Sequence, residues 1–167
     1  LMKVTVPNKQ LGIIRDTKGR PLSSLIRNTG IIKANGGIIE LSAHTAQVLS
    51  RGSVNIGSSG MIIAQSVGDK SGKVVIGSPK DNNIKISGKI DVSEPIKSLS
   101  PSGTIIIQGR NVTHTGNIYA NGRSGGKVEV LSKDNIKIDG SVLAKGNQET
   151  GGNVLFLSEN EVKITEK

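Results

Sequence analysis

The sequence predicts an all-β protein, a parallel β-helix in which five or six coils of three short strands each stack along one axis. Three observations lead to this fold class. Short alternating segments repeat roughly every 25 residues, the apolar residues are nearly all aliphatic, and no helical stretch separates the repeats. Residues 1–167 read as a single segment of such a helix, with residues 1–29 as a looser first coil and residues 30–167 as regular coils.

Each repeat holds three alternating segments. The first opens with glycine (37–41, 72–76, 103–107, 126–130, 152–156), the second mostly with asparagine (83–88, 111–116, 135–140, 161–164), and the third follows it (31–34, 61–64, 89–92, 117–120, 141–144). Alternation turns one residue inward and the next outward. The expected inward residues are aliphatic on every side: Val74, Ile105, Val128 and Val154, then Ile84, Val112, Ile136 and Val162, then Ile90, Ile118 and Val142.

The composition fits a narrow core of equivalent aliphatic positions. Aromatic residues make up 1% of the chain, whereas a globular sandwich of this size would use several aromatics at its centre. A doubly wound α/β fold also has parallel strands, but it needs helices between them that this sequence lacks. The repeats are interrupted at residues 43–51, where we expect a short helical turn, and at residues 65–71 and 94–101, where we expect loops.

Charge and cysteine content narrow the classes of partner. The formal charge of +9 would attract polyanions such as sulfated glycans, lipopolysaccharide or DNA, yet specific nucleic-acid binding is disfavoured because aromatic residues for base stacking are nearly absent. Without cysteine there are no disulfides and no thiolate metal sites. No apolar run is long enough to span a membrane, and no signal peptide opens the sequence, so we expect an interior piece of a longer shaft.

A carbohydrate-active β-helix enzyme is the main catalytic alternative. Glycosidases need two carboxyl groups about 5 Å or about 6.5–9.5 Å apart. Here Asp139 falls in a turn, Asp91 and Glu129 point outward, and no two acids occupy matching positions of successive coils on one side. We therefore expect no enzyme, and no catalytic, cofactor or metal site.

The two histidines have different expected surroundings. His114 takes the place that isoleucine has in neighbouring coils, which predicts a core imidazole bonded to the backbone. His44 lies in an insertion and is expected to be exposed. Neither has a second convergent ligand that would indicate a metal site.

Two polar series recur at fixed positions. Asn83, Asn111 and Asn135 are expected to stack their amides as a structural ladder along the rod. Lys85, Lys137 and Lys163 recur on the outward face of the second segment, with Thr113 interrupting the row. This cationic stripe either binds an acidic glycan or is a solvated face that keeps the rod soluble.

Several segments together resemble filamentous haemagglutinin-like exoproteins of two-partner secretion systems. The resemblance runs through residues 6–16, 19–22, 28–37, 36–43, 60–66 and 72–77 and the later Gly-Gly strand repeats, and so covers nearly the whole chain. It lies in the order of the segments rather than in one specific motif. The Asn-Pro motifs of the family's secretion domain are absent from this sequence, so from the resemblance we expect this piece to begin downstream of that domain.

The resemblance implies a right-handed β-helix that is exported through an outer-membrane partner pore to the surface of a Gram-negative bacterium. The implied function is a structural and adhesive shaft of a secreted filament or adhesin, with host surfaces or acidic glycans as partners. A glycan-binding module, or the stalk of a contact-dependent toxin-delivery protein, is the alternative. The open strand edges at both ends of such a segment further predict end-to-end self-association.

Overall fold

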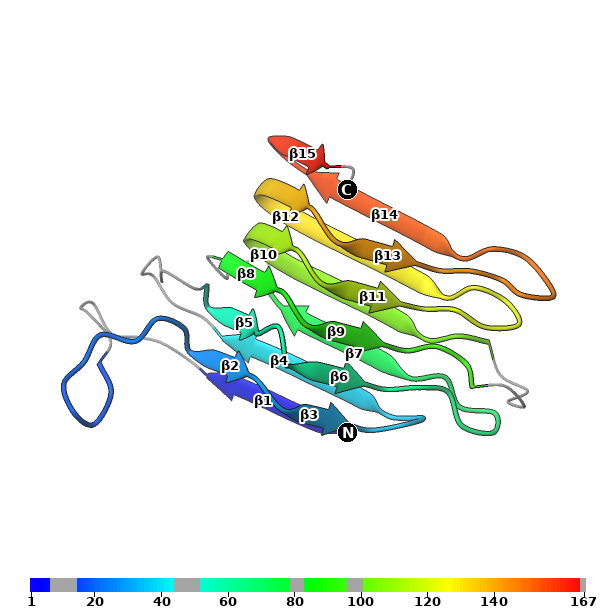
Figure 1. Ribbon diagram of the computed structural model, residues 1–167, viewed down its shortest axis with the longest axis horizontal. Helices are drawn as coiled ribbons and strands as arrows, with labels where there is room; N and C mark the ends of the chain where they lie inside the picture. Colours follow the sequence, from blue (N-terminus) through cyan, green and yellow to red (C-terminus); the bar gives the residue numbers. More distant parts are fainter. Residues whose placement is uncertain (7–14, 44–51, 79–82, 96–100, 166–167) are drawn as a thin grey trace.

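The chain forms a stack of parallel strands without helices among the residues described here, which confirms the expected all-β parallel solenoid (Figure 1). The computed structural model describes residues 1–6, 15–43, 52–78, 83–95 and 101–165. Among the described residues, the strands of the inner windings pair with their counterparts in the preceding and following windings, and every pair of these strands is parallel. The chain thus advances along one axis as it winds.

Three ladders of strands make up the stack. The first contains β1 (Met2–Val6), β4 (Ile38–Ala43), β7 (Lys73–Gly77), β10 (Thr104–His114), β12 (Lys127–Ile138) and β14 (Asn153–Ser158). The second contains β2 (Ile26–Asn28), β5 (Val54–Ile56), β8 (Asn83–Ile86), the later parts of β10 and β12, and β15 (Glu161–Ile164). The third contains β3 (Ile31–Lys33), β6 (Met61–Ile63), β9 (Lys89–Asp91), β11 (Asn117–Tyr119) and β13 (Ser141–Leu143).

The described strands make about four full turns. The chain passes in order through β3, β6, β9, β11 and β13, and β1–β2 and β14–β15 add part of a turn at either end. The sequence predicts five or six coils, and the difference lies in these incomplete end windings. The right-handed sense of the winding and its three-sided cross-section remain predictions.

The interruptions between strands are described only in part. Ala43 ends β4, and the helical turn expected beyond it falls on residues 44–51, which lie outside the described residues, as do His44 and residues 96–100. Residues 65–71, expected as a loop, contain an antiparallel bridge between Val67 and Lys70. In the expected looser first coil, β1 and β2 pair in register with β4 and β5.

The core is a set of aliphatic columns that run through the stack. Val74, Ile105 and Val128 are fully buried one above another, as are Ile84, Val112 and Ile136 in the second ladder and Ile90 and Ile118 in the third. Each such side chain contributes about 1.5–3 kcal/mol by burial. The inward set predicted from alternation is therefore confirmed for the inner windings.

The last winding departs from that expectation. Val154 and Val162 face inward but are 39% and 41% exposed, because no winding within the described residues covers them.

His114 is fully buried between Ile86 and Ile138, and its Nε2 lies 3.1 Å from the carbonyl oxygen of Ser141. This is the core, backbone-bonded imidazole that the sequence predicts.

Two columns of glycine allow the windings to approach closely at the turns. In one column a methyl group on each glycine would overlap backbone carbonyl oxygens of the winding before it; its members are Gly60, Gly88, Gly116 and Gly140. The other column, Gly103, Gly126 and Gly152, lies at the start of the first ladder and shows the same overlap. Only glycine leaves room for the carbonyl at these positions.

Substitutions at two neighbouring residues of one strand test which side chains face the core. Ile138 is 3% exposed, so Ile138→Asp should cost at least about 3 kcal/mol of unfolding free energy and abolish cooperative folding, because the carboxylate would be buried without a partner. The neighbouring Lys137→Gln, on the exposed side, should cost less than about 1 kcal/mol. Chemical denaturation of both variants tests this, and equal losses would contradict the register.

Candidate functional site

The asparagines at the entry to the second ladder form a continuous chain of amide hydrogen bonds. Asn111 Nδ2 donates to Asn83 Oδ1 at 3.0 Å, and Asn135 Nδ2 donates to Asn111 Oδ1 at 3.1 Å. Asn160 Nδ2 continues the chain with a bond of 2.9 Å to Asn135 Oδ1. Asn111 and Asn135 thus each donate to the winding before and accept from the winding after, which is a structural role.

Sequence reasoning missed the last member of this ladder. The residue paired with Asn135 is Glu161, which suggested that the series ended there. The amide of Asn160, one residue earlier, reaches the same acceptor instead. The sequence does contain an asparagine immediately before residues 161–164, one position earlier than the repeat predicts.

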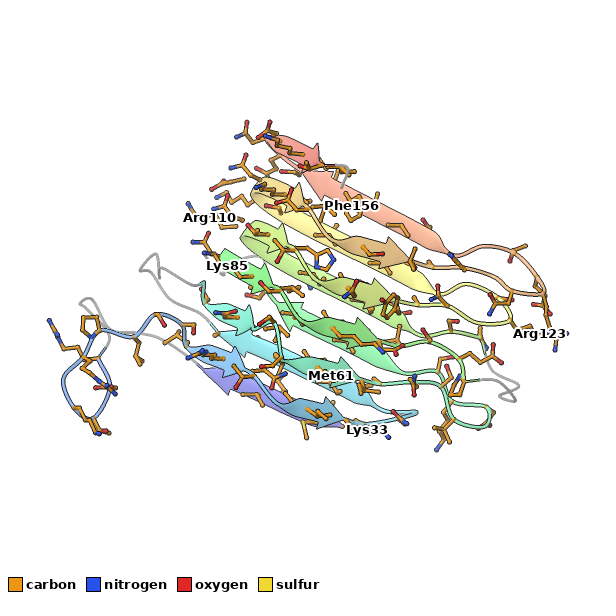
Figure 2. All side chains as sticks on the ribbon, viewed as in Figure 1. Lys33, Met61, Lys85, Arg110, Arg123 and Phe156 are labelled. Carbon is orange, nitrogen blue, oxygen red and sulfur yellow. The ribbon has the colours of Figure 1, made fainter. Side chains whose placement is uncertain are left out.

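The three lysines lie in one row across the second ladder. The register places Lys85 beside Thr113, Thr113 beside Lys137, and Lys137 beside Lys163. The row extends in the other direction through Asn55 to Arg27, a cation that the sequence repeats did not reveal. In Figure 2, Lys85 and Arg123 lie on opposite sides of the stack. Four cations and two neutral residues therefore follow one line parallel to the axis.

Asp139 offsets part of the charge of this row. Lys137 Nζ lies 2.9 Å from Asp139 Oδ2. Hydrogen bonds from Lys137 and then from Thr165 hold the pKa of Asp139 below its usual value, so the carboxylate is ionised at neutral pH. The positive potential of the row is consequently reduced around Lys137.

The two other acids that the sequence brought into consideration, Asp91 and Glu129, also pair with nearby lysines. Asp91 lies on the outer side of β9, as expected, but is only 5% exposed because neighbouring side chains cover it. Its Oδ2 is 2.9 Å from Lys89 Nζ. Burial raises the pKa of Asp91, yet hydrogen bonds from Lys89 and Ser93 outweigh this and the net shift is downward. Glu129 pairs with Lys127 at 2.7 Å.

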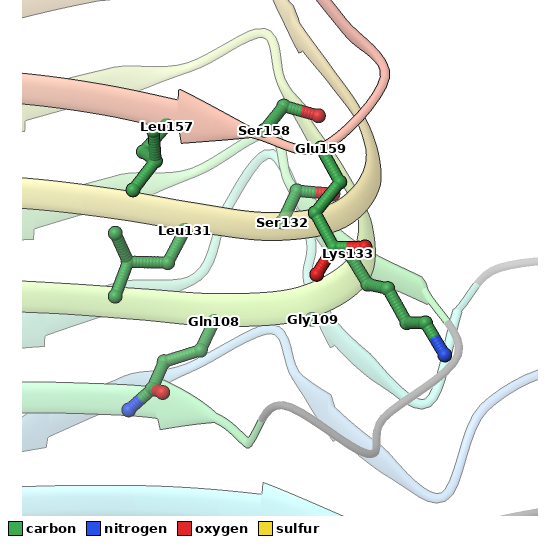
Figure 3. Close-up of a pocket in the computed structure, with 8 residues that line it drawn as sticks. All are labelled: Gln108, Gly109, Leu131, Ser132, Lys133, Leu157, Ser158 and Glu159. Atoms are coloured by element: carbon green, nitrogen blue, oxygen red, sulfur yellow. The ribbon is translucent and has the colours of Figure 1, made fainter.

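A shallow groove lies on the outer surface of the first ladder where β12 and β14 approach the second ladder (Figure 3). Its floor is the row of Gln108, Leu131 and Leu157, which are in register on successive strands. Lys133 and Glu159 stand at its rim. The groove combines apolar side chains with one amide and offers no catalytic acid pair.

The described residues contain no group of three or more His, Cys, Asp or Glu side chains placed to hold a metal ion. They also contain no helix with the length and apolar character that a membrane span requires.

Comparison of the chain with models of known protein families, with curated proteins and with solved structures finds no match. The candidate site therefore consists of two features of the second strand ladder. One is the row of cations, and the other is the chain of hydrogen-bonded asparagine amides.

Interruption of the amide ladder should destabilise the stack. Asn111 is both donor and acceptor in the ladder, so Asn111→Ala removes two hydrogen bonds and leaves two partly buried partners to find new ones. We expect a loss of about 1–3 kcal/mol in the free energy of unfolding. The exposed Asn147→Ala should change it by less than about 0.5 kcal/mol. Equal values in urea denaturation would show that the ladder contributes nothing.

Proposed function

We propose that this chain is a stretch of the shaft of a secreted bacterial surface filament or adhesin of the filamentous haemagglutinin-like type. The observation that supports this role most directly is the uninterrupted parallel stacking of windings around one aliphatic core. Such a body gains about 4.8 Å of length with each winding, so repetition converts sequence directly into reach.

The side chains that recur along the stack favour a mechanical role over a catalytic one. The amide ladder and the glycine columns fix the distance between windings, and neither provides a reactive group. Asp91, Glu129 and Asp139 each pair with a lysine two residues earlier on the same face. A glycosidase would instead need two carboxyl groups directed at one bond.

Export through an outer-membrane pore of the two-partner type belongs to the same proposal. A chain that crosses a membrane unfolded benefits from having no thiols to crosslink, and this sequence has no cysteine. Repeated short windings can also fold one after another as they emerge, because each contacts mainly its neighbours.

The location of the chain tests the proposed shaft role. An antibody raised against the 167-residue chain should label fibres or the outer surface of the producing bacterium in immunogold electron microscopy. Deletion of the gene should remove the label. Label that is confined to the cell interior in intact and sectioned cells would overturn the proposal.

A second function, binding of acidic glycans, is favoured by the cation row of Arg27, Lys85, Lys137 and Lys163. The row runs parallel to the axis, and a sulfated or uronic-acid chain lying along it would meet these four cations, of which Lys137 and Lys163 lie on adjacent strands. The partner is identified by its chemistry as a linear polyanion. Two neutral residues, Asn55 and Thr113, leave spaces in the row.

Retention on immobilised heparin tests this second function. The triple variant Lys85→Gln, Lys137→Gln and Lys163→Gln should elute at clearly lower salt than the unchanged chain, because close cations act together. Lys18→Gln, Lys70→Gln and Lys145→Gln together remove the same charge from exposed positions outside the row, and should have a smaller effect. Asp139→Asn should increase retention, since it removes the carboxylate beside Lys137. Equal elution of the two triple variants would contradict binding along the row.

A further inference from the structure

Two asparagine–glycine pairs lie at the same corner of the stack, where the chain leaves the third ladder. Asn35 and Gly36 follow β3, and Asn121 and Gly122 follow β11. Figure 2 labels Arg123, the residue after the second pair, on this side of the stack. The strands β3 and β11 belong to one ladder, with β6 and β9 between them. The two pairs therefore hold equivalent positions of the repeat in separate windings.

Asparagine followed by glycine is prone to deamidation. The backbone nitrogen of the glycine loses its proton to base and attacks the side-chain Cγ of the asparagine. The side-chain nitrogen then leaves as ammonia, and a five-membered succinimide ring remains. Water opens the ring at either carbonyl and gives aspartate or isoaspartate, so the net reaction is hydrolysis of one amide. Glycine favours ring closure because it has no side chain to hinder the approach.

One residue of the next winding binds both reacting groups of each pair. Lys145 N donates to Asn121 Oδ1 at 2.8 Å, and Gly122 N donates to the carbonyl oxygen of Lys145 at 3.0 Å. Gln65 makes the same two bonds to the earlier pair. Its N donates to the asparagine Oδ1 at 3.3 Å, and its carbonyl oxygen accepts from the glycine N at 2.7 Å. In both places the glycine N–H is thus held by a backbone acceptor.

Packing requires this reactive combination of residues. Gly36 has a φ of 65°, in the left-handed region that favours glycine. A methyl group on Gly122 would overlap the side chains of Ser102 and Glu94. The asparagine in turn supplies the acceptor for a backbone N–H of the next winding. The labile pair therefore follows from the way in which successive windings fit together.

We propose that Asn35 and Asn121 are deamidation sites that the next winding keeps unreactive, so that deamidation at each site records the opening of that winding. While the winding is in place, the glycine N–H is bonded to a carbonyl oxygen and the asparagine amide is fixed by a second bond. Local opening frees both groups together. The observed rate is then the rate in the open segment multiplied by the fraction of time for which the segment is open.

The two products differ in whether the winding can close again. Aspartate at position 121 keeps a side-chain oxygen that can accept from Lys145 N. Isoaspartate instead adds one carbon atom to the main chain immediately before Gly122, which displaces that residue from its parallel bridge with Gly146. Formation of isoaspartate therefore makes an opening permanent. This inference does not depend on the proposed shaft role, because it follows from contacts between windings alone.

Peptide mass spectrometry of the purified chain, incubated at mildly alkaline pH, measures deamidation at both sites. We expect Asn121 to deamidate at least about a hundredfold more slowly in the folded chain than in the chain kept unfolded in urea. The slowing should agree within about tenfold with the hydrogen-exchange protection of the Gly122 amide, because both reactions need the same bond to open. Equal rates in the folded and unfolded chains, or a slowing unrelated to the exchange protection, would overturn the proposal.

Two core variants test whether each site reports on its own next winding. Val142 in β13 and Ile62 in β6 hold equivalent core positions in the windings that contain Lys145 and Gln65. Val142→Ala should accelerate deamidation at Asn121 by about threefold or more, and Ile62→Val should do the same at Asn35, because each weakens one winding.

In each variant the other site should keep its original rate. Lys145→Ala is the control, since it removes a side chain but neither backbone bond, and both rates should stay unchanged. Equal acceleration at Asn35 and Asn121 in either core variant would contradict the assignment of each site to its own next winding. The absence of acceleration at both sites would contradict it as well.

Discussion

Parallel pairing at one fixed register between successive windings determines where every other feature lies. Side chains at equivalent positions of successive strands must pack directly against one another, because neighbouring strands are only about 4.8 Å apart. Aliphatic residues then stack on aliphatic residues, asparagine on asparagine and glycine on glycine. The same constraint lines up cations, whose mutual repulsion is reduced because Asn55 and Thr113 separate three of them and Asp139 pairs with Lys137.

The constraint applies to strands and far less to the segments that connect them. In the first ladder, Val74 comes 35 residues after its partner Ile39, whereas Val128 comes only 23 residues after Ile105. Their side chains nevertheless lie in one buried column. Extra residues are accommodated between strands, where they leave the stacking distance unchanged. A solenoid of this kind can therefore vary the chemistry of its surface without altering its core.

Most of the fold could be predicted from the sequence because the repeat carries the register. The segments that begin with glycine and with asparagine were expected as separate strands, but in β10 and β12 they form continuous strands with an irregularity between Gly109 and Asn111. Alternation cannot reveal this, since the bend depends on backbone geometry at one position. The pairing of Lys137 with Asp139 was accessible from the sequence, because residues two apart on a strand share a face. The bond from Asn160 was not, since its side chain reaches across the register by one residue.

The direction of the strand hydrogen bonds has a mechanical consequence. In the ladders these bonds run along the axis of the stack, whereas the covalent chain runs across it, so a tensile load along the axis passes through the hydrogen bonds in series. No single covalent path resists such a load until a winding has detached. Each winding that detaches would release one repeat as slack, for example the 23 residues from Ile105 to its partner Val128. Under traction the body would lengthen one winding at a time and dissipate force, while its remaining windings keep their shape.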